Sequence, residues 1–260
     1  MTKPIQVWMA PPGPNPWKVV VILEELKVPY EIQSIRFENI KKKPFVDLNP
    51  NGHYRTPVHV NVTGQSLIYY PNADNLVLWE SGAIIIYLVE QYDTEKIMSG
   101  RSLREKHHLN QWLYFQASGQ GPYFGQAGWF NNHHLDKLPS AIERYNNEVY
   151  RVLGVLDGCL EGKEWLVGDH ITFADIAFAP WNDRLDDVTC CAPGEGFKGF
   201  PNVKAWHERV TARPAWKKSM EIKAKLMDEQ GLTMIGIPKG MKSLQEWEKQ
   251  IKKQDEAGFK

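Results

Sequence analysis

WESGAIIIYLVEQY, residues 79–92, shows a β-type run giving way to a helix. The run from Glu80 to Tyr92 is strongly apolar and has the length of a buried helix. An acid and a hydroxyl, Glu80 and Ser81, stand at the junction. A receptor for a free α-amino acid needs an acid for the ammonium group and donors for the carboxylate, and the first N–H groups of a helix are such donors. The junction therefore predicts an amino-acid site, against the alternative that Ser81 only caps the helix.

Strand-like and helical patterns alternate before this junction. The predicted elements are a strand at 5–9, a helix at 17–27, a strand at 30–36, and short antiparallel strands at 57–62, 66–70 and 76–79. Arg55-Thr56-Pro57 opens the third strand. A cis Thr56–Pro57 bond would turn the Thr56 backbone outward, where it could pair with an extended peptide. An ordinary trans proline at a strand start is the alternative.

Capping signals mark the second part of the chain, which reads as helices separated by loops. Ser102 and Glu105 predict a capping box for a helix that we expect to end near Gly119. Thr172 and Asp175 predict a second capping box. The pattern predicts an α/β domain at 1–93, an all-helical domain at 100–220 and a charged C-terminal extension at 221–260.

Composition narrows the classes of partner. The chain has 260 residues, 42% of them hydrophobic, and equal numbers of basic and acidic residues, 31 each. This balance gives no basic field that would attract nucleic acid or an anionic membrane, so we expect a small molecule or a second copy as partner. Three cysteines, two of them adjacent, argue against a disulfide framework. The N-terminus lacks a signal-peptide core and no long apolar span occurs, so we expect a cytoplasmic protein.

Two histidine pairs, His107-His108 and His133-His134, raise the question of metal binding. Neighbouring histidines on a helix point in different directions, and no carboxylate cluster accompanies either pair. We therefore expect no metal site.

An ordered set of motifs runs through the chain between about residues 5 and 216. They are GPNPWKV at 13–19, NPNG at 49–52, TP at 56–57, WESGAI at 79–84, NQWLYFQASG at 110–119, AIERY at 141–145, WLVGD at 165–169, TFAD at 172–175 and APWN at 179–182. The set resembles the glutathione transferases, and more narrowly the fungal branch related to the nitrogen-regulator prion protein. The resemblance implies an α/β thioredoxin-like N-terminal domain plus an all-α C-terminal domain, with glutathione as cofactor.

The resemblance also implies roles in holding glutathione. Glu80 and Ser81 would hold the γ-glutamyl end, and the Thr56 backbone ahead of Pro57 would pair with the cysteinyl unit. Lys41 would hold the glycine carboxylate, since an ammonium point charge suits that task. Which of the three consecutive lysines beginning at Lys41 reaches glutathione stays open.

Asn15 is the residue that the resemblance sets beside the glutathione sulfur. A thiol with a pKa of about 8.5 is mostly protonated at neutral pH, and the thiolate is the nucleophile. Many family members use a Tyr, Ser or Cys after the first strand, but this chain has none between Trp8 and Lys18. The Asn15 amide and the start of the following helix are the predicted thiolate stabilisers. Such donors can favour a thiolate but cannot take its proton.

The second, apolar substrate is expected where the two domains meet. The candidate residues are Tyr114, Gln120, Tyr123, Phe124, Trp129 and Trp181. The leading hypothesis is a transferase that adds the glutathione thiol to an electrophilic apolar small molecule, as in fungal specialised metabolism. The alternatives are a glutathione-dependent cis–trans isomerase of a conjugated olefin and a regulatory or interaction protein without turnover. The resemblance further implies a homodimer.

Overall fold

The computed structural model describes residues 3–36, 39–40, 42–49, 66–70, 75–234 and 236–241. The predicted strand at 57–62 lies outside the described residues, as do Lys41, Thr56 and Pro57.

A sheet of order β2-β1-β3-β4 forms the centre of the first domain in the described part of the chain. Its strands are β1 (Ile5–Met9), β2 (Tyr30–Ser34), β3 (Ser66–Tyr70) and β4 (Leu76–Trp79). β1 is parallel to β2 and antiparallel to β3, which is antiparallel to β4. The predicted strands at 5–9, 66–70 and 76–79 are confirmed, and β2 ends two residues before its predicted limit.

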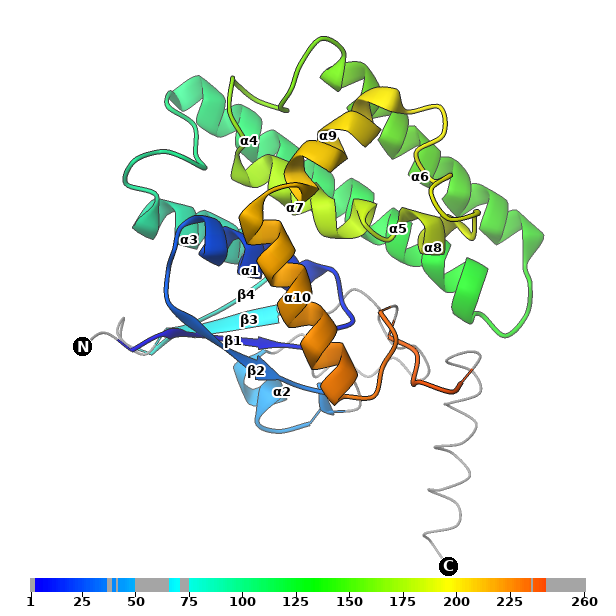
Figure 1. The fold of residues 1–260 in the computed structure, drawn as a ribbon, viewed down its shortest axis with the longest axis horizontal. Helices are drawn as coiled ribbons and strands as arrows, with labels where there is room; N and C mark the ends of the chain where they lie inside the picture. The colour runs from blue at the N-terminus through cyan, green and yellow to red at the C-terminus, as the bar shows by residue number, and fades with distance from the viewer. Residues whose placement is uncertain are drawn as a thin grey trace, which may run out of the picture.

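Helices cover both faces of this sheet. α1 (Asn15–Glu25) and α3 (Ser81–Tyr92) lie on one face, and the short α2 (Phe45–Leu48) lies on the other (Figure 1). Because β1 and β2 are parallel, their connection must cross over the sheet, and α1 is that crossover. Val7 and Ile68 pair across the sheet and are fully buried in the large core.

The second domain is a set of helices. They are α4 (Leu103–Phe115), η3 (Gln116–Gln120), α5 (Gly121–Gly128), η4 (Trp129–His133), α6 (Pro139–Leu160), α7 (Phe173–Asn182), α8 (Leu185–Thr189), α9 (Pro201–Thr211) and α10 (Pro214–Glu229). Most of them lie on the far side of α1 and α3 from the sheet, while α10 runs beside α1 down to the level of the sheet (Figure 1). One hydrophobic core runs through both domains, because α7 and α10 pack directly against α1. α10 crosses the predicted border at residue 220, and the domain borders stay a prediction. Of the helices described, none is both long and apolar enough to cross a bilayer.

The helix expected to end near Gly119 continues, so this prediction was wrong. α4 passes through the π-helical turn η3 into α5 without a break in the chain's helical course. A Cβ built on Gly119 would lie 3.4 Å from the Phe115 ring, which is about an ordinary van der Waals contact. The buried side-chain amides of Gln116 and Gln120 hydrogen-bond to each other within η3, so the helical course satisfies them.

The two predicted capping boxes differ. Thr172 and Asp175 form the complete reciprocal box at the start of α7. At the start of α4 only one half is present: the Ser102 hydroxyl accepts from the Glu105 N–H at 3.2 Å, but the Glu105 carboxylate accepts from the Arg101 N–H at 2.6 Å.

Candidate functional site

A buried loop delivers Asn15 to the domain interface. Residues 9–23 are all buried except Asn15, which keeps partial exposure. The loop is held from both sides: the Trp17 indole N–H donates to the Pro11 carbonyl at 2.8 Å, and Arg184 Nη1 donates to the Pro12 carbonyl at 2.9 Å. α1 begins at Asn15, two residues before the predicted start, because a proline in the first turn gives up no helical hydrogen bond.

Asn15 joins the first domain to the second. Its Oδ1 accepts a hydrogen bond from Trp181 Nε1 of α7 at 3.1 Å. An indole N–H can only donate, so the amide oxygen must face the indole. This contact fixes the orientation of the side chain and turns its Nδ2 donor away from Trp181.

The start of α3 lacks a cap from its own side chains. Glu80 is the N-cap residue, with φ 71 and ψ 112, and no side-chain cap hydrogen bond is made there. Positive φ is unfavourable for a residue with a Cβ and costs about 1–3 kcal/mol. Glu80 is exposed and Ser81 half-buried. Ser81 is the first helical residue and not the cap, so the capping alternative for this serine does not hold.

A buried polar network links α1 to the helical domain. Lys18 is 3% exposed, and its Nζ donates to Gln116 Oε1 at 2.5 Å. Gln116 Nε2 donates to Gln120 Oε1 at 3.0 Å, and Gln120 Nε2 donates to Asn182 Oδ1 at 2.7 Å. Burial lowers the pKa of Lys18 to about 7, and the negative charge of Glu80 partly opposes this change. Gln120, expected at the second substrate, instead has its amide committed to this network.

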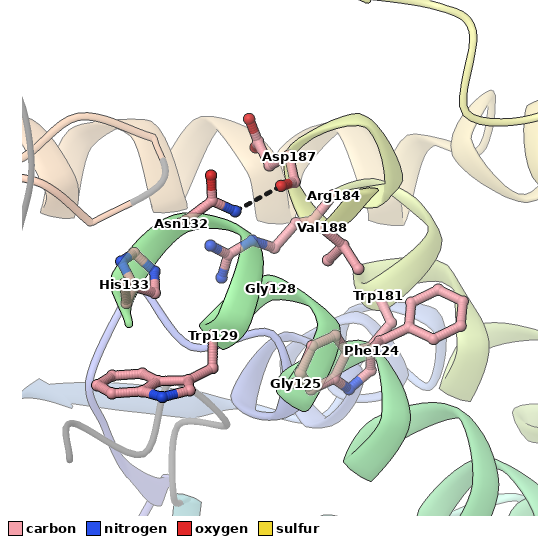
Figure 2. Close-up of a pocket in the computed structure, with 10 residues that line it drawn as sticks. All are labelled: Phe124, Gly125, Gly128, Trp129, Asn132, His133, Trp181, Arg184, Asp187 and Val188. Carbon is pink, nitrogen blue, oxygen red and sulfur yellow. Dashed lines mark hydrogen bonds between the residues drawn. The ribbon is translucent and has the colours of Figure 1, made fainter. Parts of the chain in front are cut away.

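A pocket is lined by Trp181, the hydrogen-bond partner of Asn15, and comprises about 320 Å³ of space between atoms, part of it open to solvent. One wall comes from α5 and η4, with Phe124, Gly125, Gly128, Trp129, Asn132 and His133. The other wall comes from α7, α8 and their junction, with Trp181, Arg184, Asp187 and Val188 (Figure 2). Three of the six predicted substrate residues, Phe124, Trp129 and Trp181, therefore line one pocket.

The remaining predicted residues lie elsewhere. Tyr114 is 70% exposed on α4, and neither it nor Gln120 lines this pocket. Tyr123 faces α6, where the Arg151 guanidinium lies 5.8 Å from the centre of its ring. The places of Lys41, Thr56 and Pro57 in a glutathione site stay predictions.

Charged groups gather behind the pocket, and the sequence reasoning missed them. Arg184 is 8% exposed, and burial lowers its pKa while Asp187 and Asp183 oppose that change. Lys223 of α10 faces the same groups, and burial followed by Arg184 lowers its pKa to about 8. The sequence feature that could have identified them is a charged residue beside or within an apolar helix: Arg184 follows α7, and Lys18 lies within α1. No group of three potential metal ligands occurs among the described residues.

Comparison with known proteins places the chain in a family. It matches the profile "Glutathione S-transferase, N-terminal domain" over residues 12–91 and "Glutathione S-transferase, C-terminal domain" over residues 122–214. The glutathione S-transferase-like protein gedE of Aspergillus terreus is 45% identical over 224 residues, which cover 83% of this chain and 93% of gedE.

Solved structures agree with this assignment. The glutathione transferase URE2P6 of Phanerochaete chrysosporium, in complex with oxidized glutathione, is 39% identical with a TM-score of 0.77, covering 86% of this chain and 98% of its own. Ure2p5 of the same fungus, with 1-(S-glutathionyl)-2,4-dinitrobenzene, is 36% identical with a TM-score of 0.74, covering 88% and 98%. The thioredoxin-like and all-helical architecture is confirmed, and the chain belongs to the glutathione S-transferase family, in its fungal Ure2-like branch.

Proposed function

We propose that this protein is a glutathione transferase that joins the glutathione sulfur to an electrophilic aromatic small molecule. The observation that carries the proposal is the exposure of Asn15 within an otherwise buried stretch, together with its bond to Trp181 of the pocket wall. The sulfur of a glutathione molecule beside Asn15 would lie at the mouth of an aromatic pocket. Ure2p5, crystallised with a dinitrophenyl conjugate of glutathione, supports this pairing of ligands.

Glutathione is held in this proposal by the uncapped start of α3. Glu80 takes the ammonium group, while the Ser81 hydroxyl and the first N–H groups of α3 take the γ-glutamyl carboxylate. Thr56, Pro57 and Lys41 are assigned the cysteinyl and glycyl parts on the resemblance alone.

The reaction needs a thiolate. The Asn15 Nδ2 donor, turned away from Trp181, and the start of α1 lower the pKa of the bound thiol, whose proton leaves to water. The sulfur attacks a ring carbon that bears a leaving group. The carbon–sulfur bond forms, and the leaving group departs with the electron pair of its own bond.

Asn15→Ala tests the proposal. We expect the pKa of bound glutathione to rise and turnover to fall, while glutathione affinity at low pH, where the thiol is protonated, stays nearly unchanged. Thiolate absorbance titrated against pH in the two complexes measures the shift. Trp181→Phe is the companion variant, because it keeps Asn15 and removes the indole N–H that orients it, together with part of a buried ring. Identical titration curves for wild type and Asn15→Ala would refute the role of Asn15.

A second candidate reaction is favoured by the absence of a Tyr, Ser or Cys between Trp8 and Lys18. Reversible addition of the thiolate to a conjugated olefin, rotation and elimination would isomerise the olefin and regenerate glutathione. Free thiol and product mass distinguish the two reactions. Thiol consumption with a mass increase means conjugation, and altered geometry at constant mass means isomerisation. No reaction with either substrate class would favour a regulatory protein.

The proposal includes a cytoplasmic homodimer, the assembly expected of this family and the commonest symmetric one. Light scattering tests it, since a mass near 29.9 kDa at every concentration would mean a monomer.

A further inference from the structure

The pocket beside Asn15 has two chemically different ends. At the end near Asn15, Phe124 and Trp181 meet edge to face, with ring centroids 6.3 Å apart. At the other end, on η4, lie Asn132 and His133. Figure 2 shows the Arg184 guanidinium extending toward this second end and away from Trp181. An aromatic ligand that fills the pocket would therefore have one edge by the sulfur and the other by a cation.

Two cations, Arg184 and Lys137, act on the end of the pocket at His133. The pKa of His133 is lowered to about 4, first by burial and then by the cations Arg184 and Lys137. Its imidazole is therefore neutral at neutral pH and can share a hydrogen bond without adding charge. Lys137 is held at this end, because its ammonium donates to the Asn131 carbonyl.

Acidic groups also lie nearby, but the charges that shift the pKa of His133 are those of Arg184 and Lys137. Asp187 lines the pocket, and in the view of Figure 2 it lies beyond Asn132, whose amide donates to the Asp187 carbonyl at 2.7 Å. Asp183, Asp186 and Lys223 also act on Arg184 or Asp187, as two further acids and one further base. We therefore expect a moderate preference for an anion and not an absolute requirement.

We propose that this pocket selects aromatic electrophiles that carry a carboxylate on the edge remote from the reacting carbon. Arg184 and the neutral His133 hold the carboxylate, Trp129 flanks the aromatic body, and the reacting carbon faces the sulfur at Asn15. A guanidinium suits this task, because it is always charged and its planar donors match a carboxylate. The inference rests on the proposed function for the position of the sulfur.

The test uses two substrates of nearly equal shape, one charged and one neutral: 4-chloro-3,5-dinitrobenzoate and its primary amide. We expect kcat/KM for the acid over the amide, corrected for the uncatalysed rates, to favour the acid by about tenfold, the size of one charge-assisted contact. In Arg184→Gln, which keeps a donor for the Pro12 carbonyl but no charge, this ratio should fall to about one. Because the amide is measured on the same protein, a general loss of folding cancels from the ratio.

Lys223→Gln is the matched control. It removes a buried cation from the same charged group, but Lys223 does not line the pocket. The ratio should stay within about twofold of wild type. A ratio that falls equally in both variants would overturn the assignment to Arg184, since a diffuse field would then explain the preference.

Binding of the two thioether products separates this inference from the proposed function. Calorimetry should show the carboxylate product binding about tenfold more tightly than the amide product, whether or not the protein turns over. Absence of thioether formation together with this preference would refute the transferase and leave the inference standing. Equal affinities would overturn the inference and leave the transferase standing, and no binding of either product would overturn both.

Discussion

Two helices of this protein, α7 and α3, start in opposite ways. At α7 the Asp175 carboxylate accepts four hydrogen bonds: from the Leu166 N–H at 3.0 Å, the Thr172 N–H and hydroxyl at 2.8 Å each, and the Trp206 indole at 2.9 Å. At α3 no side chain caps the helix, and Glu80 is held at positive φ. At α7 the capping hydrogen bonds are made by side chains of the protein itself, while at α3 the first backbone N–H groups have no side-chain cap and can donate to a ligand.

The difference separates stability from binding within one fold. Asp175 is fully buried, so its bonds hold α7, the loop at Leu166 and the indole of α9 in one arrangement. Glu80 is exposed, and its strain is kept only because the neighbouring elements hold it. Substitutions at α7 should therefore change unfolding, and substitutions at α3 should change glutathione binding.

Asp175→Ala should have the largest effect. It removes the cap and leaves buried donors unpaired, so we expect a loss of about 3–5 kcal/mol in the free energy of unfolding. Urea denaturation measures this loss, and glutathione affinity of the folded fraction should not change. Asp169→Ala is the control, because this aspartate is exposed and its ion pair with Arg101 is screened by solvent, so its loss should change stability little. A similar small loss in both variants would contradict the importance given to the α7 box.

Ser81→Ala should lower glutathione affinity and leave stability nearly unchanged, the reverse of the result expected for Asp175→Ala. A hydrogen bond to a charged group contributes about 1.5–3 kcal/mol, so glutathione affinity should fall roughly tenfold or more. Stability should change by about 0.5 kcal/mol at most, because the Ser81 hydroxyl caps nothing. Ser102→Ala is the matched serine: it caps α4 and should lose about 1 kcal/mol of stability without loss of affinity. Calorimetric titration and denaturation of both variants decide the matter.

Glu80→Gly should separate the two properties at one residue. Glycine accepts positive φ, so relief of strain, less the entropy that glycine loses on folding, should raise the free energy of unfolding by about 1 kcal/mol. The same change removes the partner of the glutathione ammonium, so affinity should fall. Glu80→Gln keeps the strain and loses the charge, and it should lose affinity with no gain in stability. A glycine variant less stable than wild type would show that the Glu80 side chain stabilises the native state.

Sequence patterns predicted the features that depend on neighbouring residues in the chain. The α7 box follows from Thr172 and Asp175 three residues apart, and the period of apolar residues gave most helices and strands. The φ angle of Glu80 does not follow from its neighbours, because it depends on how β4 and α3 pack. Gly119 has the residue type of a helix end, but it lies inside the helical turn η3, which joins α4 to α5.

Motif and residue type named Asn15, Glu80 and Ser81, whose roles in binding stay predictions, and three aromatic residues that line one pocket. The charged end of the pocket was missed, because Arg184 reaches it only when α8 and η4 pack together. Lys18 was missed for a similar reason. A lysine in an apolar helix can extend to solvent, and only the arrival of Gln116 from the other domain gives its ammonium a buried partner.

Lys18 provides the smallest and most selective test of the start of α3. The charge of Lys18 interacts with Glu80 at this start, whereas no charged side chain is among the groups that shift the pKa of Asp175 at the start of α7. The native pKa of Lys18 is about 7, below its usual 10.5, so the ammonium is charged below pH 7 and largely neutral above it. The charged form attracts the Glu80 carboxylate and repels the ammonium of a bound glutathione, so binding should tighten as pH rises through 7. S-methylglutathione is the ligand to use, since it has no thiol proton to confuse the titration. We expect its affinity in the wild type to rise about two- to fivefold between pH 6 and pH 8, the effect of one screened charge. Lys18→Met should bind with an affinity that is nearly constant over this range, whereas an unaltered pH profile in the variant would show that Glu80 does not sense Lys18.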